Sequence, residues 1–214
     1  MDNILITGAT GLLGSSLMPY LKNCGHKVIT HGHTLHADFM FDLSSREKTY
    51  RMLSEIQPTV IINLVSLTSV ERCEERVDLA YLINTSTIEN IVYWLQTSKE
   101  NCHLIQISTD HVYDGDGVDL NTEDNISITN NYAFSKYAGE LAATRVPSTI
   151  LRTNFVGRSK VSHRESLTDW VYDNLTAGKH VEVLDDVYFS PLSITKLVEI
   201  IELVMKKKMI GSRD

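Results

Sequence analysis

Short, continuously apolar segments alternate along this chain with longer segments whose apolar residues recur at helical spacing. Strands that are apolar on both faces are typical of a parallel sheet that helices cover on both sides. The alternation therefore predicts an α/β fold with a doubly wound parallel sheet. We expect strands over residues 3–7, 27–30, 59–66, 103–109, 148–157 and 180–184, and helices over residues 12–23, 45–55, 77–97, 132–143, 166–178 and 194–204, the last one capped by Ser190 or Ser193.

Length and composition narrow the class of protein. The chain has 214 residues, of which 43% are apolar and 22% charged, which suffices for one domain with one substantial core. Its net charge of −7 argues against nucleic acid and anionic membranes as partners. The cysteines are widely spaced and form no CxxC pair, and there is neither a signal peptide nor an apolar run of membrane-spanning length. We therefore expect a reduced, cytoplasmic protein.

The first strand–helix turn, "ILITGATGLLGSSL" (residues 4–17), carries Gly8, Gly11 and Gly14. In such a turn one glycine permits a tight bend, a second lets the backbone approach a pyrophosphate, and a third lets the helix pack against the strand. The spacing is GxxGxxG and differs from the GxGxxG dinucleotide pattern, and a turn needed only for packing would look the same. Its place in the first turn of an α/β chain favours a dinucleotide site.

The end of the second strand bears on the choice of cofactor. An acidic residue there favours NAD, and an arginine nearby favours NADP. The stretch "ITHGHT" has neither signal, and its His31 and His33 either meet a 2′-phosphate or lie in an ordinary loop. The absence of the acid makes NADP the preferred expectation with NAD left open, and Asp42 is the next position that could contact an adenine.

Tyr132 and Lys136 stand four residues apart at the start of an expected helix, so they project from the same face. An ammonium beside a phenol lowers the pKa of that phenol, and such a tyrosine can exchange a proton with a carbonyl or alcohol oxygen. A surface pair without a function would have the same spacing. Ser108 and Thr109 follow the fourth strand, where their hydroxyls either bind a substrate oxygen or cap the strand end.

No metal site is expected in this chain. Asp114, Asp116 and Asp119 do not fit a calcium-binding EF-hand loop, because Asp119 stands where that loop needs its glycine. The eight histidines include no HExxH or other metal-binding spacing.

Taken together, the stretches "TGATGLLG", "NLVS", "STDHVYDG" and "YAFSK" resemble the extended short-chain dehydrogenase/reductases. Within that superfamily, the chain is similar from Asn3 to about Pro191 to the dTDP-4-dehydrorhamnose reductases and their sugar-nucleotide-binding relatives. The resemblance implies a Rossmann-type NAD(P)-binding domain over residues 1–214. It also implies NAD(P)-dependent reduction of a nucleotide-linked 4-keto sugar in surface polysaccharide synthesis.

By this resemblance, Thr109, Tyr132 and Lys136 form the catalytic set. Tyr132 would protonate the carbonyl oxygen as hydride reaches the sugar, while Lys136 would hold the cofactor ribose and Thr109 would orient the carbonyl. The residues expected at the cofactor are Gly8, Thr10, Gly11, Leu12 and Leu13 in the pyrophosphate turn, His31 after the second strand, Asp42 and Leu43 at the adenine, Asn63, Leu64 and Val65 under the ribose, and Asn154 near the nicotinamide, together with Tyr132 and Lys136.

The chain departs from the family pattern in two places. The family's fold is not finished at Asp214, so we expect the substrate lobe, to which residues 156–190 contribute, to be incomplete in this chain. Ser15 stands where rhamnose reductases carry an acidic residue that is used in metal-assisted dimerisation. This replacement argues against a metal-linked dimer, although a homodimer stays open.

Two other functions stay open. Relatives of the family include non-catalytic NAD(P)-binding regulatory proteins, and the incomplete lobe favours that hypothesis, whereas the Thr109, Tyr132 and Lys136 set favours the reductase. A sugar-nucleotide epimerase or dehydratase is the other alternative. A dehydratase would carry an acid after Asp110, where this chain has His111, so the dehydratase is disfavoured.

Overall fold

The computed structural model describes residues 2–33, 36–98, 100–113, 125–161, 165–182, 190–208 and 211–213. Seven parallel strands in these parts of the chain form one sheet in the order β3-β2-β1-β4-β5-β6-β9. The order in which the chain adds strands reverses at β1, because β2 and β3 lie on one side of it and β4, β5 and β6 on the other. The carboxyl ends of β1 and β4 therefore mark the switch point where doubly wound folds bind ligands. The strands are β1 (Asn3–Thr7), β2 (Lys27–Gly32), β3 (Phe39–Met40), β4 (Val60–Asn63), β5 (His103–Ser108), β6 (Ser148–Arg152) and β9 (Gly211–Arg213).

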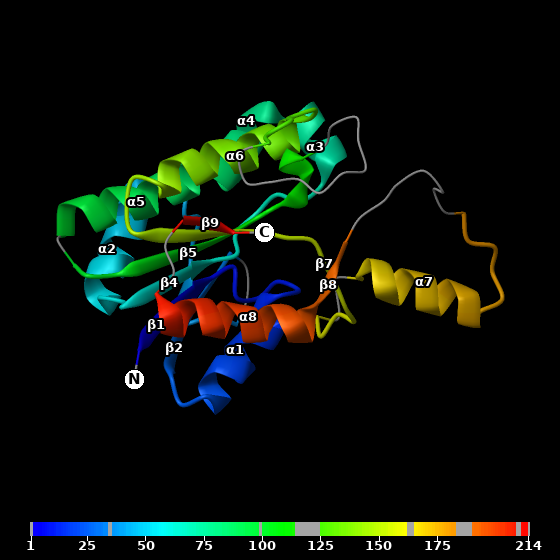
Figure 1. Ribbon diagram of the computed structural model, residues 1–214, viewed down its shortest axis with the longest axis horizontal. Coiled ribbons are helices and arrows are strands. Elements are labelled where there is room, and N and C mark those ends of the chain that lie inside the picture. The colour runs from blue at the N-terminus through cyan, green and yellow to red at the C-terminus, as the bar shows by residue number, and fades with distance from the viewer. Residues whose placement is uncertain are drawn as a thin grey trace.

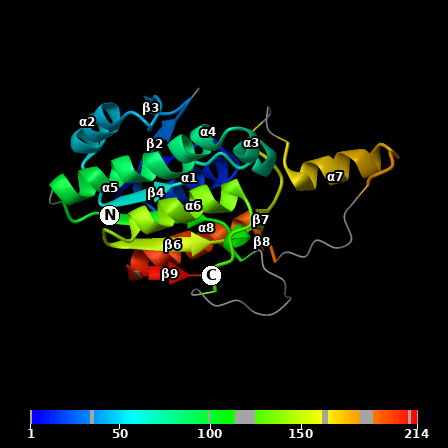
Figure 2. The same cartoon turned by 90° about the horizontal axis from the view of Figure 1, so that it is seen from above.

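Helices cover both faces of this sheet, as Figures 1 and 2 show. On one face lie α1 (Gly14–Asn23) and α8 (Ile194–Lys207). On the other face lie α2 (Arg46–Ile56), α5 (Thr87–Ser98) and α6 (Asn131–Ala143). The expected doubly wound α/β sheet is therefore confirmed.

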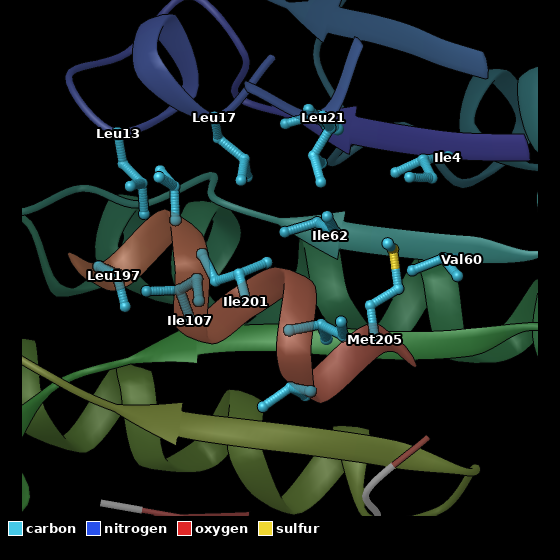
Figure 3. Close-up of a cluster of buried hydrophobic side chains, with 14 of the residues drawn as sticks. Ile4, Leu13, Leu17, Leu21, Val60, Ile62, Ile107, Leu197, Ile201 and Met205 are labelled. Carbon is cyan, nitrogen blue, oxygen red and sulfur yellow. The ribbon is translucent and has the colours of Figure 1, made fainter. Parts of the chain in front are cut away.

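Alternate residues of each buried strand feed two separate cores. In β1, Ile4 and Ile6 face α1 and α8, whereas Leu5 faces the opposite helices. Figure 3 shows the first core, where Leu17 and Leu21 of α1 point toward the sheet beside α8 side chains such as Ile201. Each of these side chains is fully buried, which stabilises the fold by about 1.5–3 kcal/mol per side chain. The continuous apolar runs of the strands are the sequence signature of this two-sided burial.

Besides the short helix that begins after Ser69, three helices begin at residues whose side chains accept a hydrogen bond from a first-turn backbone N–H. Asn130 caps α6, Ser166 caps α7 (Leu167–Thr176), and Ser193 caps α8. The cap of α8 is thus Ser193, one of the two expected residues. In α7, the Asp169 carboxylate also accepts from the backbone of Ser166, which completes a capping box.

The expected helix over residues 77–97 consists of three helical pieces. It contains α4 (Val77–Tyr81), a π-helical turn η1 (Leu82–Ser86) and α5, preceded by the short helix α3 (Val70–Glu75). A π-helical turn inside a helix is frequent at functional sites. Here it contributes Asn84 to the site described below.

The expected strand over residues 148–157 belongs to two sheets. The chain leaves the main sheet after Arg152, and β7 (Phe155–Val156) then pairs with β8 (Leu192–Ser193) in a small second sheet. Within the expected strand over residues 180–184, the described residues 180–182 form no strand, and the other two lie outside the described residues. The 3-10 turn η2 (Asp110–Val112), β3, β8 and β9 were not expected from the sequence.

Helix α7 stands away from the main body in both Figure 1 and Figure 2, and none of its residues is buried. It lies in the segment that the sequence assigns to the substrate lobe. None of the helices in the described ranges is both long and apolar enough to cross a bilayer. All three cysteines are free thiols.

Candidate active site

A cleft of about 290 Å³ opens at the switch point, at the carboxyl ends of β1, β4 and β5 and just beyond β6. The glycine turn, the loop after β4, the end of β5 and helix α6 all contribute to its wall. Its lining residues include the expected Gly8, Gly11, Leu12, Leu13, Leu64, Thr109, Tyr132, Lys136 and Asn154, together with Ser66, Ser108, His111 and Phe155. Residues expected from five separate stretches of sequence therefore meet in one place.

The glycine turn approaches the end of β4 closely. Gly8 has a φ of +69°, and a Cβ on it would lie 3.0 Å from the carbonyl carbon of Leu64 and from the amide nitrogen of Val65. At Gly14, a Cβ would lie 2.5 Å from the carbonyl oxygen of Ala9. Both positions therefore need glycine for packing, whatever the turn binds.

The first turn of α1 differs from those of α6, α7 and α8. The residue before this helix, Leu13, makes no side-chain cap, and no acidic residue lies in the first turn. The N-terminal amides of a helix carry partial positive charge, so an uncapped end beside a glycine turn suits a phosphate. The local structure of residues 8–17 thus fits the pyrophosphate of a dinucleotide.

Lys136 is buried beneath the cleft, with 4% of its surface exposed. Its Nζ donates a hydrogen bond of 2.7 Å to the carbonyl oxygen of Ile107 in β5. Burial lowers the pKa of Lys136 to about 8, while the carboxylate of Glu140 acts in the opposite direction. The lysine is consequently a group whose charge changes close to neutral pH.

Tyr132 lies one turn before Lys136, and 9% of its surface is exposed. Burial raises the pKa of its phenol, and hydrogen bonds with Thr109 and Ser66 partly offset that rise. The ring of His111 packs edge-on against the Tyr132 ring, with the centroids 5.4 Å apart. A phenol with two hydroxyl neighbours in a cleft is suited to pass a proton to an oxygen bound there.

The sequence-based expectation that Lys136 lowers the pKa of Tyr132 does not describe this structure. The pKa of the phenol is raised because the ring is buried, and the ammonium of Lys136 donates to the Ile107 carbonyl. The two side chains share a helix face, but desolvation of the phenol dominates here.

Thr109 lies at the carboxyl end of β5 and is 3% exposed. Its side-chain oxygen accepts a hydrogen bond of 3.2 Å from the backbone N–H of His111, so the hydroxyl caps the 3-10 turn η2. The same hydroxyl takes part in the hydrogen bond with Tyr132. Thr109 therefore caps the turn that follows β5, and it also lines the cleft.

Asn84 is a site residue that sequence reasoning missed. It lies in the π-helical turn η1 and is 1% exposed. Its Oδ1 accepts hydrogen bonds from the N–H of Leu67, 2.8 Å away, and the hydroxyl of Ser66, 3.1 Å away, and its Nδ2 donates to Ser135 over 2.9 Å. Asn84 thereby ties the loop after β4 to helix α6 beside Tyr132. Its only sequence signal was an amide inside an otherwise regular helical pattern.

A buried ion pair behind the cleft was also missed. Glu140 on α6 pairs with Arg152 at the end of β6 over 2.8 Å, and the two side chains are 2% and 5% exposed. Glu140 also accepts a hydrogen bond from the Ser108 hydroxyl, and Arg152 donates to the Tyr113 hydroxyl over 2.8 Å. The available signal was an acid placed eight residues after Tyr132, on a helix face that has to be buried.

The side chain of Asn63 is hydrogen-bonded within the sheet. Its Oδ1 accepts from the Thr7 hydroxyl over 2.5 Å, and its Nδ2 donates to Gln106 over 2.8 Å. The three residues are paired side by side on β1, β4 and β5 and are at most 1% exposed. Gln106 in turn donates to the Ile107 carbonyl that receives Lys136. The Asn63 side chain is thus committed to a buried row beneath the cleft.

His31 also differs from the expectation that it contacts the cofactor. It is 2% exposed, and its Nε2 lies 2.9 Å from the carbonyl oxygen of Phe41. Burial lowers the pKa of His31, so the ring is neutral near pH 7 and unsuited to pair with a phosphate. At the end of β2, the parallel neighbour β1 and the ring of Phe41 enclose it.

The remaining expected cofactor residues lie outside the cleft. Leu43 is 2% exposed and packs in the second core, where Val65 also packs. Asp42 is exposed, and its Oδ1 accepts a hydrogen bond from the Ser44 amide over 2.8 Å. Thr10 lies against the end of β2, where a Cβ added to Gly32 would come within 2.9 Å of Cγ2 of Thr10.

Metal binding finds no support in the described ranges, where no three His, Cys, Asp or Glu side chains gather as they would around an ion. Asp114, Asp116 and Asp119 lie outside the described residues. Ser15, the residue at the family's acidic position, donates a hydrogen bond of 2.9 Å to the Leu12 carbonyl within the glycine turn.

Comparison with curated proteins shows relatives that act in glycan synthesis. SpsK of Bacillus subtilis, a spore coat polysaccharide biosynthesis protein, is 33% identical over 159 residues, which cover 73% of this chain and 54% of SpsK. Agl14 of Haloferax volcanii, a probable low-salt glycan biosynthesis reductase, is 29% identical over 196 residues, which cover 87% of this chain and 65% of Agl14. The chain thus spans between about half and two thirds of the length of these relatives.

Solved structures share the fold closely. A hypothetical dTDP-4-dehydrorhamnose reductase from Sulfolobus tokodaii has a TM-score of 0.88 and 31% identity, and the match covers 98% of this chain and 74% of that one. The dTDP-4-dehydrorhamnose reductase of Bacillus anthracis, solved with NADP, has a TM-score of 0.87 and 25% identity, with coverage of 98% and 72%. A family model described as the RmlD substrate binding domain matches residues 1–213. The chain therefore belongs to the RmlD substrate binding domain family, within the extended short-chain dehydrogenase/reductases and together with the dTDP-4-dehydrorhamnose reductases.

Proposed function

We propose that this chain is the cofactor-binding part of an NAD(P)H-dependent reductase that acts on a nucleotide-linked 4-keto sugar. The observation that carries the proposal is the meeting of the Gly8–Gly14 turn with Thr109, Tyr132 and Lys136 in one cleft at the switch point. The relatives that act in polysaccharide and glycan synthesis support a product destined for a surface glycan.

The residues present fit a dinucleotide. Gly8 and the uncapped start of α1 would receive the pyrophosphate, and Lys136 would donate to the ribose on the nicotinamide side. β2 ends without an acidic residue, which supports NADPH over NADH. The similar dTDP-4-dehydrorhamnose reductase of Bacillus anthracis was solved with NADP. When bound, a reduced nicotinamide supplies the hydride.

Tyr132 is the proposed proton donor to the substrate oxygen. A tyrosine phenol is protonated at neutral pH, and burial raises the pKa of this one further, so it holds the proton that a forming alkoxide needs. Thr109 and Ser66 orient the phenol by hydrogen bonding. Thr109 has a second role, which is to orient the carbonyl group of the substrate in the cleft. The side-chain amide of Asn84 fixes Ser66 in turn.

Fluorescence titration with NADPH and NADH tests the cofactor site. We expect NADPH to bind more tightly than NADH, and failure of both to bind at millimolar concentration would refute the dinucleotide site. The full chain with a dTDP-linked 4-keto sugar then tests the chemistry. We expect Tyr132→Phe to lower turnover by at least about 100-fold with a nearly unchanged cofactor affinity.

Two outcomes separate the alternatives. Cofactor binding without turnover of any 4-keto sugar would support the regulatory protein, whereas full turnover in Tyr132→Phe would assign proton transfer to another group. Tyr137→Phe is the matched control, because Tyr137 lies on the same helix and is not among the residues that line the cleft.

A further inference from the structure

Helix α6 presents three functional groups at intervals of four residues. Tyr132 and Lys136 line the cleft, and Glu140 follows one turn later behind its wall. Residues four apart on a helix are neighbours on one face, and Lys136 and Glu140 contact consecutive residues of β5, Ile107 and Ser108, so the carboxylate is near the ammonium. Glu140 is 2% exposed, and the energetic cost of such a buried carboxylate has to be offset by specific partners.

Hydrogen-bond donors surround the carboxylate of Glu140. Arg152 donates from Nε to both carboxylate oxygens, over 3.2 and 3.1 Å, and from Nη2 to Oε2 over 2.8 Å. Ser108 donates a further hydrogen bond to Oε1. These donors, one of them a guanidinium, offset the cost of burying the carboxylate.

Lys136 forms no ion pair with any residue in the described parts of the chain. Its ammonium donates a hydrogen bond to the neutral carbonyl oxygen of Ile107. On the elements that pack against α6, three acids have other partners, since Glu74 accepts from Asn131, Asp78 pairs with Arg76 and Glu89 accepts from Tyr81. The other titratable groups on α6 and its neighbours include Glu71, Arg72, Cys73 and Glu75 on α3, Tyr81 on α4, Tyr93 on α5, Tyr132 and Tyr137 on α6, Asp110 and His111 on η2, Tyr113 after it, and His103 at the start of β5.

We propose that Glu140, held in place by Arg152, keeps Lys136 protonated inside the protein. Glu140 supplies the negative charge that a buried ammonium needs, and Arg152 holds the carboxylate in place and limits its attraction for the lysine. Both are positioning residues, because they act through Lys136 and do not line the cleft. The inference deepens the proposed function, on which it rests for the role of Lys136.

The proposal predicts that the pKa of Lys136 shifts in opposite directions in two variants. Glu140→Gln removes the anion beside Lys136, so the pKa of the lysine falls below its value of about 8 by roughly one unit. Arg152→Met removes a cation and frees the carboxylate to act on the lysine alone, so the pKa of Lys136 rises by a similar amount. Loss of packing alone would not move the two variants in opposite directions.

NMR of protein labelled with 13C at the lysine Cε measures this directly in the full chain without cofactor or substrate. The Lys136 signal is assigned by its loss in Lys136→Met and followed from pH 6 to pH 11. Matched controls are Glu199→Gln on α8 and Arg51→Met on α2, which change the net charge by the same amounts at exposed ion pairs. We expect both controls to leave the pKa of Lys136 within about 0.2 units of the parent value.

The proposal is overturned if Glu140→Gln and Arg152→Met shift the titration of Lys136 in the same direction, or if neither moves it further than its control. If either single variant does not fold, the double variant Glu140→Gln/Arg152→Met decides, because it removes both buried charges together. It has to lower the pKa of Lys136, since the carboxylate is gone.

A second measurement links the pair to the cofactor. NADPH affinity is measured as a function of pH for each variant. We expect it to fall on the alkaline side, with its midpoint at the pKa of Lys136 that NMR gives for that variant. If the parent protein binds neither NADPH nor NADH, the proposed function fails, while the NMR titration still decides the role of the ion pair.

Discussion

Gly8→Ala tests how closely the phosphate-binding turn approaches β4. With a φ of +69°, an alanine at this position costs about 1–2 kcal/mol of stability through backbone strain. Its Cβ would also lie 3.0 Å from two backbone atoms of Leu64 and Val65, which cannot rotate away as a side-chain end could. Overpacking of this kind typically costs a further 1–3 kcal/mol or so.

Gly25→Ala isolates the second effect. Gly25 has a φ of +85°, and no heavy atom lies within 4 Å of the position that its Cβ would take. The strain term and the reduced entropy of the unfolded chain are shared by both variants and cancel in the comparison. We therefore expect Gly8→Ala to lose about 1–3 kcal/mol more than Gly25→Ala.

Equilibrium unfolding in urea, with parent and variants compared at equal protein concentration, measures this difference. NADPH titration of the same samples is expected to show loss of binding in Gly8→Ala and unchanged affinity in Gly25→Ala. Equal stability losses in the two variants would refute the argument that the turn is packed against β4. Unchanged NADPH binding in Gly8→Ala would remove the turn from the proposed cofactor site.

Two further predictions concern the helices. Leu197 in α8 is 1% exposed, so Leu197→Ala should lower the free energy of unfolding, measured by urea titration, by about 2–5 kcal/mol. Leu203 on the same helix is 48% exposed, so Leu203→Ala should change that free energy by no more than about 0.5 kcal/mol. Equal losses would contradict the assignment of the α8 face that enters the core. The hydrogen bond from the Ser166 side chain is the main reason that the pKa of Asp169 is lowered to about 2. The capped start of α7 is therefore stabilised fully above about pH 4, and it loses that stabilisation as the pH falls toward 2. Backbone chemical shifts of α7 should lose helical character over that range, and Ser166→Ala should move the loss to higher pH; an α7 that is insensitive to acid in both proteins would contradict the capping box.

Much of the site could be predicted because it depends on local patterns. The apolar runs of β1 and β4 require burial on both faces, so the parallel sheet and the carboxyl-end position of the site follow from the sequence. The Gly8–Gly14 turn and the four-residue spacing of Tyr132 and Lys136 are short-range features that hold wherever the helix packs. Ser193 was recognised as a helix cap for the same reason.

Other features depend on contacts between residues that are far apart in the sequence. Lys136 meets the carbonyl of Ile107, 29 residues away, and Glu140 meets Ser108, 32 residues away, because α6 packs across β5. The same packing raises the pKa of Tyr132 by burial, which outweighs the effect expected from its neighbour on the helix. No pattern along the chain encodes such desolvation.

The sequence by itself therefore determined the alternation of the main strands and helices, the glycine turn and the helix face that carries Tyr132 and Lys136. Tertiary structure alone decided that His31 and Asn63 are enclosed within the protein, that the chain leaves the main sheet after Arg152, and that a buried ion pair lies behind the lysine. The physical reason is that periodicity specifies which face of an element is buried, whereas the charge state of a buried group depends on which partners the neighbouring elements bring to it.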